Sequence, residues 1–257
     1  MRGARRPDTL FWVDLARVSG NRLSLDADES RHLLRVFRAE PGVLFDATDG
    51  AGTRYRCRLA EDHHGEARAE ILSRESGAGE LPGSIHLIVG LPDMHAAEAI
   101  VEHAVPLGAT SIVFAACRRS GRELMSDSRL ERLERIAVAG VKQSLRSTLP
   151  VVGGVASLGI ALEAVKGGLH LVADPEGVAM GSRREEWLAS LDDLVQPTIT
   201  LAVGPPGAFD DGEAAELRRV GFHSISLGPN RLTTETASIA LLAGARNLLV
   251  EWTLPPI

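Results

Sequence analysis

Two glycine-bearing loops near the carboxyl end of the chain carry the residues best placed to do chemistry. The first loop reads GPPGAF at 204–209 and follows an apolar run that ends at Val203. The second lies within SLGPNRLTTETA at 226–237, directly before an amphipathic stretch. Glycines let backbone N–H and C=O groups come close to a flat ligand. Two ordinary turns between strands and helices would have the same spacing, so a ligand site and plain turns are both open.

Basic residues gather at two further places that suit contact with phosphate. One group recurs at helical spacing near the amino end, and the other follows an apolar run that ends at Ala115. Clustered cations suit a phosphate backbone, and the planar guanidinium also stacks on bases. A solvated helix face would show the same pattern, so RNA contact and plain exposure remain alternatives. The candidate residues are Arg31, His32, Arg35, Arg38, Arg118 and Arg119.

Composition excludes several classes of protein. The 257 residues are 44% hydrophobic and 24% charged, with a formal net charge of −6, which is typical of a globular protein. The two cysteines, Cys57 and Cys117, lie 60 positions apart without metal-ligand spacing, so we expect neither a disulfide framework nor a metal site. No apolar run reaches the length of a membrane span, and the start resembles no secretory signal. These features predict a cytoplasmic protein that binds no membrane.

The pattern of elements changes across a Gly-, Ser- and Pro-rich segment at 75–84. Before it, short alternating stretches and one helix, expected at Glu29–Phe37, indicate a small β-barrel or sheet. After it, apolar strands alternate with amphipathic helices, which indicates a mostly parallel sheet with ligands at the carboxyl ends of its strands. Ser128 and Glu131 form a capping-box pattern, and Asp210 with Glu213 offers a second helix cap.

The expected strands of the first part are Leu23–Leu25, Val43–Ala47, Tyr55–Leu59 and Ala67–Leu72. Those of the second part are Ile85–Val89, Ser111–Ala115, Leu169–Ala173, Thr198–Val203 and His223–Leu227. The expected helices of the second part are Met94–Val105, Ser128–Leu145, Arg183–Leu191, Asp211–Val220 and Thr234–Val250.

Together with LGATSIV at 107–113 and RIAVAGVKQSLRSTLPVV at 135–152, the two loops resemble the RsmE-type methyltransferases of the SPOUT superfamily. These enzymes methylate N3 of a uridine in small-subunit ribosomal RNA, and their signature is a GPEGGF loop followed by SLGxxILRTETA. The segments SRHLLRVFRAEPG at 30–42 and DGAGTRYRCRL at 49–59 are similar to the family's amino-terminal domain.

The resemblance implies an α/β protein of two domains. Residues 1–78 would form a PUA-like β-barrel that binds RNA, and residues 79–257 a SPOUT domain with a deep carboxy-terminal trefoil knot. It also implies a homodimer that needs no metal, with S-adenosylmethionine as cofactor and 16S rRNA or the small ribosomal subunit as partner. The implied cofactor-binding residues are Gly204, Pro205, Gly207, Leu227, Gly228, Asn230, Leu232 and Thr234.

The chain departs from the family pattern at positions that matter for chemistry. Pro206 stands at the acidic position of GPEGG and Ala208 at its second glycine. Thr233 replaces the arginine of LRTETA, while Glu235 is retained, and Leu145 stands where the family has a glycine after QS. Two interpretations follow: a working enzyme with local replacements, or a degenerate paralogue that binds RNA or the ribosome without catalysing.

Arg231 offers a replacement for the missing cation. It lies two residues before Thr233, and residues i and i+2 of an extended segment point the same way. A cation beside the uridine carbonyls would stabilise the anion that forms when N3 loses its proton. Arg231 and Glu235 are therefore the candidate catalytic residues.

Overall fold

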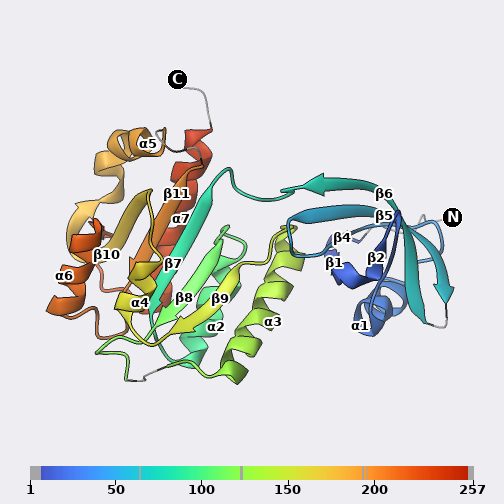
Figure 1. Cartoon of the computed structure of the whole chain (residues 1–257), viewed down its shortest axis with the longest axis horizontal. Helices are drawn as coiled ribbons and strands as arrows, with labels where there is room; N and C mark the ends of the chain where they lie inside the picture. Colours follow the sequence, from blue (N-terminus) through green and yellow to red (C-terminus); the bar gives the residue numbers. More distant parts are fainter. Residues whose placement is uncertain (1–6, 64, 122–123, 193, 195, 254–257) are drawn as a thin grey trace. The chain divides into compact units, whose positions relative to one another are not determined.

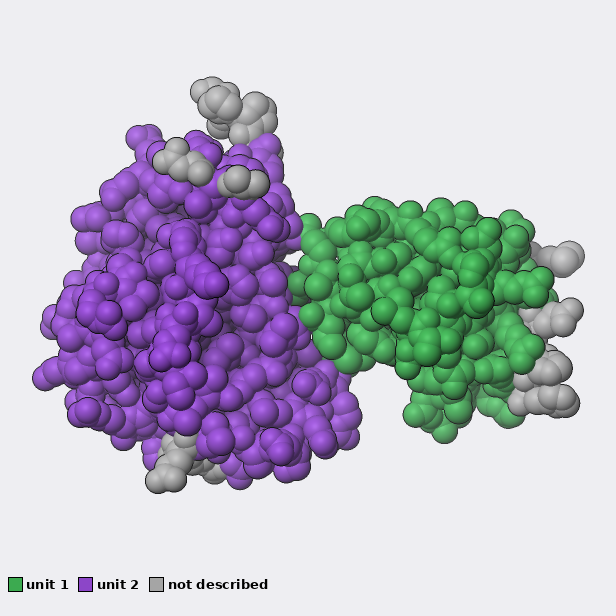
Figure 2. Space-filling model, viewed as in Figure 1, with its two compact units in different colours: residues 1–80, 138–149 green, residues 81–137, 150–257 purple. Residues whose placement is uncertain are grey.

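The chain forms two compact units in the computed structural model (Figure 2). The first comprises Met1–Glu80 with Val138–Leu149, and the second Leu81–Ala137 with Pro150–Ile257. Nothing in the sequence patterns pointed to the return of residues 138–149 into the first unit. The structure describes residues 7–63, 65–121, 124–192, 194 and 196–253.

The first unit contains a six-stranded sheet of order β1-β4-β5-β6-β3-β2 (Figure 1). β1 pairs with β4 in parallel, and the other neighbours are antiparallel. The four expected strands correspond to β3, β4, β5 and β6, whereas the short β1 and β2 were not predicted. The strands are β1 (Leu10–Trp12), β2 (Val18–Ser19), β3 (Arg22–Ser24), β4 (Leu44–Thr48), β5 (Thr53–His63) and β6 (Glu66–Ser76).

The helix expected at Glu29–Phe37 begins earlier and changes character midway. Asp26 caps α1 (Ala27–Arg31), because its Oδ1 accepts a hydrogen bond of 2.8 Å from the Glu29 N–H. The chain continues as a π-helix over His32–Val36, and a 3-10 turn, η1 (Leu15–Arg17), precedes β2. Edge-to-face contacts of Phe11 with neighbouring rings fill the core of this unit.

The second unit is a six-stranded parallel sheet of order β12-β10-β11-β7-β8-β9 with helices on its faces (Figure 1). The alternation of strands and helices therefore predicted the fold class correctly. The strands are β7 (Ser84–Gly90), β8 (Ser111–Ala115), β9 (Val151–Val155), β10 (Leu169–Ala179), β11 (Thr198–Val203) and β12 (His223–Ser226). The helices are α2 (Met94–Ala104), α3 (Asp127–Ser144), α4 (Leu158–Glu163), η3 (Met180–Arg183), α5 (Arg184–Asp192), α6 (Asp211–Val220) and α7 (Thr234–Trp252).

Two groups of helices cover this sheet. α7 packs against α2, β7 and β11, whereas α4 packs against α6 and contacts β8 and β9. Ile88 and Ala202 of the central strands share a buried cluster with Leu162 of α4 and Leu217 of α6. The continuous apolar runs of β7 and β11 are those of strands buried on both faces.

One predicted helix start is right and the other is wrong. Asp210 and Glu213 form a complete capping box at α6, in which each side chain accepts from the other residue's backbone N–H. α3 already includes Asp127, so Ser128 lies inside its first turn, where its hydroxyl pairs with that of Ser126 at 3.3 Å. The short α4 and the glycine-bearing β9 were missed because neither offers enough periodic apolar residues.

A buried ion pair fixes residues 138–149 to the first unit. The Glu80 carboxylate accepts hydrogen bonds from Arg146 Nε (3.0 Å) and Nη2 (2.7 Å). Its other oxygen accepts from the backbone N–H groups of Ser147 and Thr148, both at 2.9 Å. The Arg146 side chain is 4% exposed, so the pair is shielded from solvent screening.

We expect Glu80→Ala to lower the free energy of unfolding by about 3–5 kcal/mol, because a buried guanidinium loses the carboxylate that compensates its charge. Urea denaturation followed by circular dichroism measures this. Glu70→Ala is the control, since Glu70 meets Arg58 with both side chains more than half exposed and should cost less than about 1 kcal/mol. Equal losses for the two variants would contradict an anchoring role for Glu80.

Candidate functional site

The site lies where the order of the parallel sheet reverses. β7 is followed by β8 on one side and has β11 as its neighbour on the other. In open α/β sheets, ligands bind outside the carboxyl ends of the strands at such a point. Gly90 ends β7 and lies directly against Pro205: a Cβ on Gly90 would lie 2.3 Å from Pro205 Cδ. Gly90 was not among the predicted site residues, although a glycine at the end of an apolar strand was a visible signal.

The first glycine loop (residues 204–209) is a tight turn that accepts the replaced residues. The Ala208 N–H donates to the Pro205 carbonyl at 2.8 Å, which places Pro206 second in a four-residue turn. Proline is favoured there, and its missing N–H is not needed. Ala208 adopts φ +60°, a left-handed conformation that glycine reaches without strain. The loop therefore keeps a glycine-type backbone at Ala208.

The second glycine loop (residues 227–233) leaves backbone accessible beside the first. Gly228 has φ +112°, and a Cβ there would meet no heavy atom within 4 Å, so open space lies next to its main chain. Leu227 and Leu232 are half-buried, and Asn230 is exposed. This combination of bare backbone and apolar side chains suits a flat, partly apolar ligand.

One hydrogen bond joins the two loops. Thr234, the buried first residue of α7, donates from Oγ1 to the Gly204 carbonyl at 3.1 Å. Gly204 has no room for a side chain, because a Cβ would lie 2.9 Å from the Phe209 nitrogen. The structure thus brings together Gly204, Pro205 and Thr234, which the sequence placed in two separate motifs.

The candidate catalytic residues lie at the start of α7. Thr233 is the N-cap, and its Oγ1 accepts from the Thr236 N–H at 3.4 Å, a role for which threonine is suited and arginine is not. Arg231 is exposed and Glu235 is half-buried in the first turn of α7. Among the described residues none forms an ion pair with Arg231, so its exposed guanidinium is available to a ligand.

The two arginines after β8 have different surroundings. Arg118 Nη1 lies 3.3 Å from Asp210 Oδ2, and its side chain is 79% exposed. Arg119 Nη1 donates to the carbonyls of Gly207 at 3.0 Å and Phe209 at 3.5 Å. Arg119 therefore touches the first glycine loop, a contact that the sequence did not indicate.

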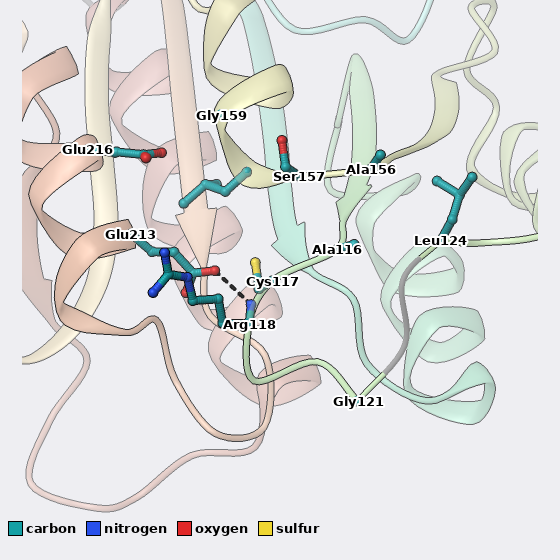
Figure 3. Close-up of a pocket in the computed structure, with 11 residues that line it drawn as sticks. Ala116, Cys117, Arg118, Gly121, Leu124, Ala156, Ser157, Gly159, Glu213 and Glu216 are labelled. Carbon is teal, nitrogen blue, oxygen red and sulfur yellow. Dashed lines mark hydrogen bonds between the residues drawn. The ribbon is translucent and has the colours of Figure 1, made fainter.

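A cavity of about 940 Å³ lies beside this segment, between the chain after β8 and β9 and the first turns of α4 and α6 (Figure 3). Of the predicted site residues that the structure describes, only Arg118 lines it. The Glu213 carboxylate at its wall already accepts from the Arg118 and Asp210 backbone N–H groups. The Ser157 hydroxyl caps α4. These polar groups make capping hydrogen bonds at helix ends, so they give no reason to assign a reaction to the cavity.

Cys117 also lines this cavity without offering a nucleophile. Burial raises the pKa of its thiol to about 12, and the neighbouring Glu213 carboxylate adds to the shift. The thiol is therefore protonated at neutral pH, whereas thiolate is the reactive form. Cys117 is therefore poorly suited to act as a nucleophile.

The basic residues of the first unit divide into two kinds. Arg31 and Arg35 are exposed and, with Leu34 and Gly65, line a depression of about 390 Å³. Arg38 is exposed with φ +52°. The ring of His32 instead packs against aromatic rings of the core, 5.6 Å from Phe11 and 5.0 Å from Phe37 between centroids. Its ring is thus occupied by packing on the sheet.

Within the described part of the chain, no cluster of three or more His, Cys, Asp or Glu side chains could hold a metal ion. Nor does any helix of the described residues have the length and apolar character needed to cross a bilayer.

Comparison with known proteins agrees with this geometry. Residues 79–246 match the family described as RNA methyltransferase domain, and residues 25–72 match the RNA methyltransferase PUA domain. The chain is 30% identical over 231 residues to ribosomal RNA small subunit methyltransferase E of Synechocystis sp., covering 88% of this chain and 73% of that protein. It is 27% identical to the protein of that name from Mycobacterium bovis, over 95% of this chain and 93% of the relative.

A solved structure shares the fold. Ribosomal RNA small subunit methyltransferase E from Neisseria gonorrhoeae, bound to S-adenosyl methionine, superposes with a TM-score of 0.76. The match covers 93% of this chain and 97% of that one at 24% identity. It therefore shows that the two chains have the same fold.

We expect Ala208→Gly to raise the free energy of unfolding by up to about 1 kcal/mol. A left-handed alanine costs about 1–2 kcal/mol, and the extra freedom of glycine in the unfolded chain offsets about half of that. Urea denaturation measures the change, and Ala240→Gly in the exposed middle of α7 is the control, expected to lose about 1 kcal/mol. A destabilised Ala208→Gly variant would show that the alanine methyl makes a contact of its own.

Proposed function

This chain belongs to the RNA methyltransferase domain family, and we propose that it transfers a methyl group from S-adenosylmethionine to N3 of a uridine in 16S ribosomal RNA. The observation that carries this proposal is the hydrogen bond from Thr234 to the Gly204 carbonyl. It joins the two loops that correspond to the family's signature motifs, so the replaced residues leave the paired loops intact.

The residues of the two loops fit S-adenosylmethionine through their main chain. Gly204, Pro205 and Gly207 would line one side, and Leu227, Gly228, Asn230, Leu232 and Thr234 the other. The fit rests on the open space at Gly228 and on the turn that Pro206 and Ala208 preserve. When bound, this cofactor supplies an electrophilic methyl group, so no metal is required.

The side chains at the start of α7 would manage the proton and the charge. N3 of uridine must lose its proton as the new N–C bond forms and the S–CH3 bond breaks. We assign the Glu235 carboxylate as the acceptor of that proton, because it lies next to Thr234 at the junction of the loops. We assign the exposed Arg231 guanidinium to the negative charge that spreads over the uridine carbonyls.

RNA binding would use exposed arginines on both units. Arg31, Arg35 and Arg38 supply cations on the first unit, and Arg118 on the second. His32 is half-buried and packs against Phe11 and Phe37, so it would contribute less to RNA contact than these arginines. Lysines and arginines that neutralise phosphates make binding depend steeply on salt.

Three further features follow from the same family and belong to this proposal. The chain after β12 would form a deep trefoil knot, and the contact of Thr234 with Gly204 supports this. The first unit would close as a PUA-like barrel. The protein would act as a cytoplasmic homodimer, and light scattering during gel filtration tests the dimer directly.

Calorimetric titration with S-adenosylmethionine, followed by methylation of purified small ribosomal subunits, tests the proposed function. We expect about one site per chain with micromolar affinity and a product with the methyl group on uridine N3. No detectable binding at high ligand concentration would instead favour the degenerate paralogue that binds RNA or the ribosome without catalysing.

We expect Arg231→Ala to lower the methylation rate about 10²–10³-fold and Glu235→Gln about 10²–10⁴-fold, with cofactor affinity nearly unchanged. The first loses charge stabilisation in the transition state, and the second loses the proton acceptor. Single-turnover methylation measures both. Arg219→Ala is the control, since the Arg219 side chain is exposed on α6 and makes no hydrogen bond or ion pair with any described residue. A wild-type rate in Arg231→Ala would remove this residue from the mechanism.

A further inference from the structure

We infer that Arg119 is a positioning residue that holds the first glycine loop in its cofactor-binding shape. Its Nη1 donates to the carbonyls of Gly207 and Phe209, which lie on either side of Ala208. This assignment rests on the proposed function, and it gives Arg119 a task other than contact with RNA.

The contact covers the strained part of the loop. Ala208 is held at φ +60°, and left-handed alanine relaxes unless its surroundings fix it. The Gly207 carbonyl belongs to the peptide group directly before Ala208, so the shorter Arg119 contact fixes that group, and the longer contact with the Phe209 carbonyl holds the second peptide group after it. Hydrogen bonds from a charged donor are about twice as strong as neutral ones.

The stem of Arg119 also packs on the loop. A Cβ on Gly207 would lie 3.0 Å from Arg119 Cβ and 3.3 Å from its Cδ, so the aliphatic part of the arginine lies against the bare Gly207 backbone. A side chain at position 207 would crowd the stem of Arg119, so glycine suits this contact.

The backbone that carries Arg119 is itself anchored. The Cys117 N–H donates to Ser120 Oγ at 3.0 Å, and the Ser120 N–H donates back to the Cys117 carbonyl at 2.9 Å. The Arg118 N–H donates to Glu213 Oε1 at 2.8 Å, and Glu213 is buried in the capping box of α6. A side chain that leaves such a fixed turn can restrain a loop, whereas one on a mobile segment would follow it.

The two ends of the loop are thus held by different means. Its start is fixed by Gly90 and Thr234, which meet Pro205 and the Gly204 carbonyl. Its far half depends on Arg119. Pro206 has no N–H that could donate a hydrogen bond within the loop. The Arg119 guanidinium, which lies outside the loop, therefore supplies the hydrogen bonds that restrain the Gly207 and Phe209 carbonyls.

The test compares cofactor and RNA binding for the same variants. We expect Arg119→Ala to weaken S-adenosylmethionine about 10–100-fold, as loss of a charge-assisted hydrogen bond would, and Arg119→Lys to weaken it less. RNA affinity and its dependence on salt should stay at the wild-type values. Arg219→Ala is the control and should change neither.

A double-mutant cycle with Ala208→Gly separates positioning from a general loss of structure. If Arg119 restrains the strained residue, its loss should weaken cofactor binding several-fold less when position 208 is glycine. An unchanged cofactor affinity in Arg119→Ala, with weaker RNA binding and a salt slope lower by about one, would overturn the inference in favour of a phosphate contact. Absence of cofactor binding by the wild type would refute the proposed function instead.

Discussion

The close approach of three backbone segments at the carboxyl ends of β7 and β11 is the constraint on which the site depends. The parallel pairing of these strands brings Gly90 against Pro205, and no side chain larger than hydrogen fits between them. The hydrogen bond from Thr234 then fixes the start of α7 to the Gly204 carbonyl. Because main chain and buried contacts define this junction, residues on the open side of the loops can vary while the junction itself is kept.

The residues that depart from the family pattern change the side chain but keep the local backbone. Pro206 occupies a turn position where its fixed φ and missing N–H cost nothing, and Thr233 serves as a helix cap. Ala208 and Leu145 both stand where the family has glycine, and both keep a left-handed backbone, at φ +60° and φ +61°. Each left-handed conformation costs about 1–2 kcal/mol in a residue other than glycine. The chain therefore keeps a glycine-type backbone at both positions although the glycines themselves are replaced.

The sequence predicted well those strands and helices whose signal lies within a few neighbouring residues. β8, β11 and α6 match their expected bounds, because a bounded apolar run or a capping box sets each one. The short β1 depends on β4, which lies far along the chain, and β2 has only two residues, so no pattern in the sequence predicts either strand. The same holds for the site: glycine loops were visible, whereas the approach of Gly90 to Pro205, the contact of Arg119 and the packing of His32 on Phe11 arise only in the folded chain.

Geometry and charge make separate demands on this site. Binding a cofactor through backbone groups requires the shape of the loops, and the Thr234 junction, the turn at Pro206 and the restraint from Arg119 all act on that shape. Stabilising an anion requires a cation near the reacting base, which no loop shape can supply. Thr233 removes one cation and Arg231 introduces another two residues earlier, exposed beside the same junction. Whether the protein catalyses or only binds RNA therefore depends on whether the Arg231 guanidinium reaches the reacting base, because the fold around it is the same in either case.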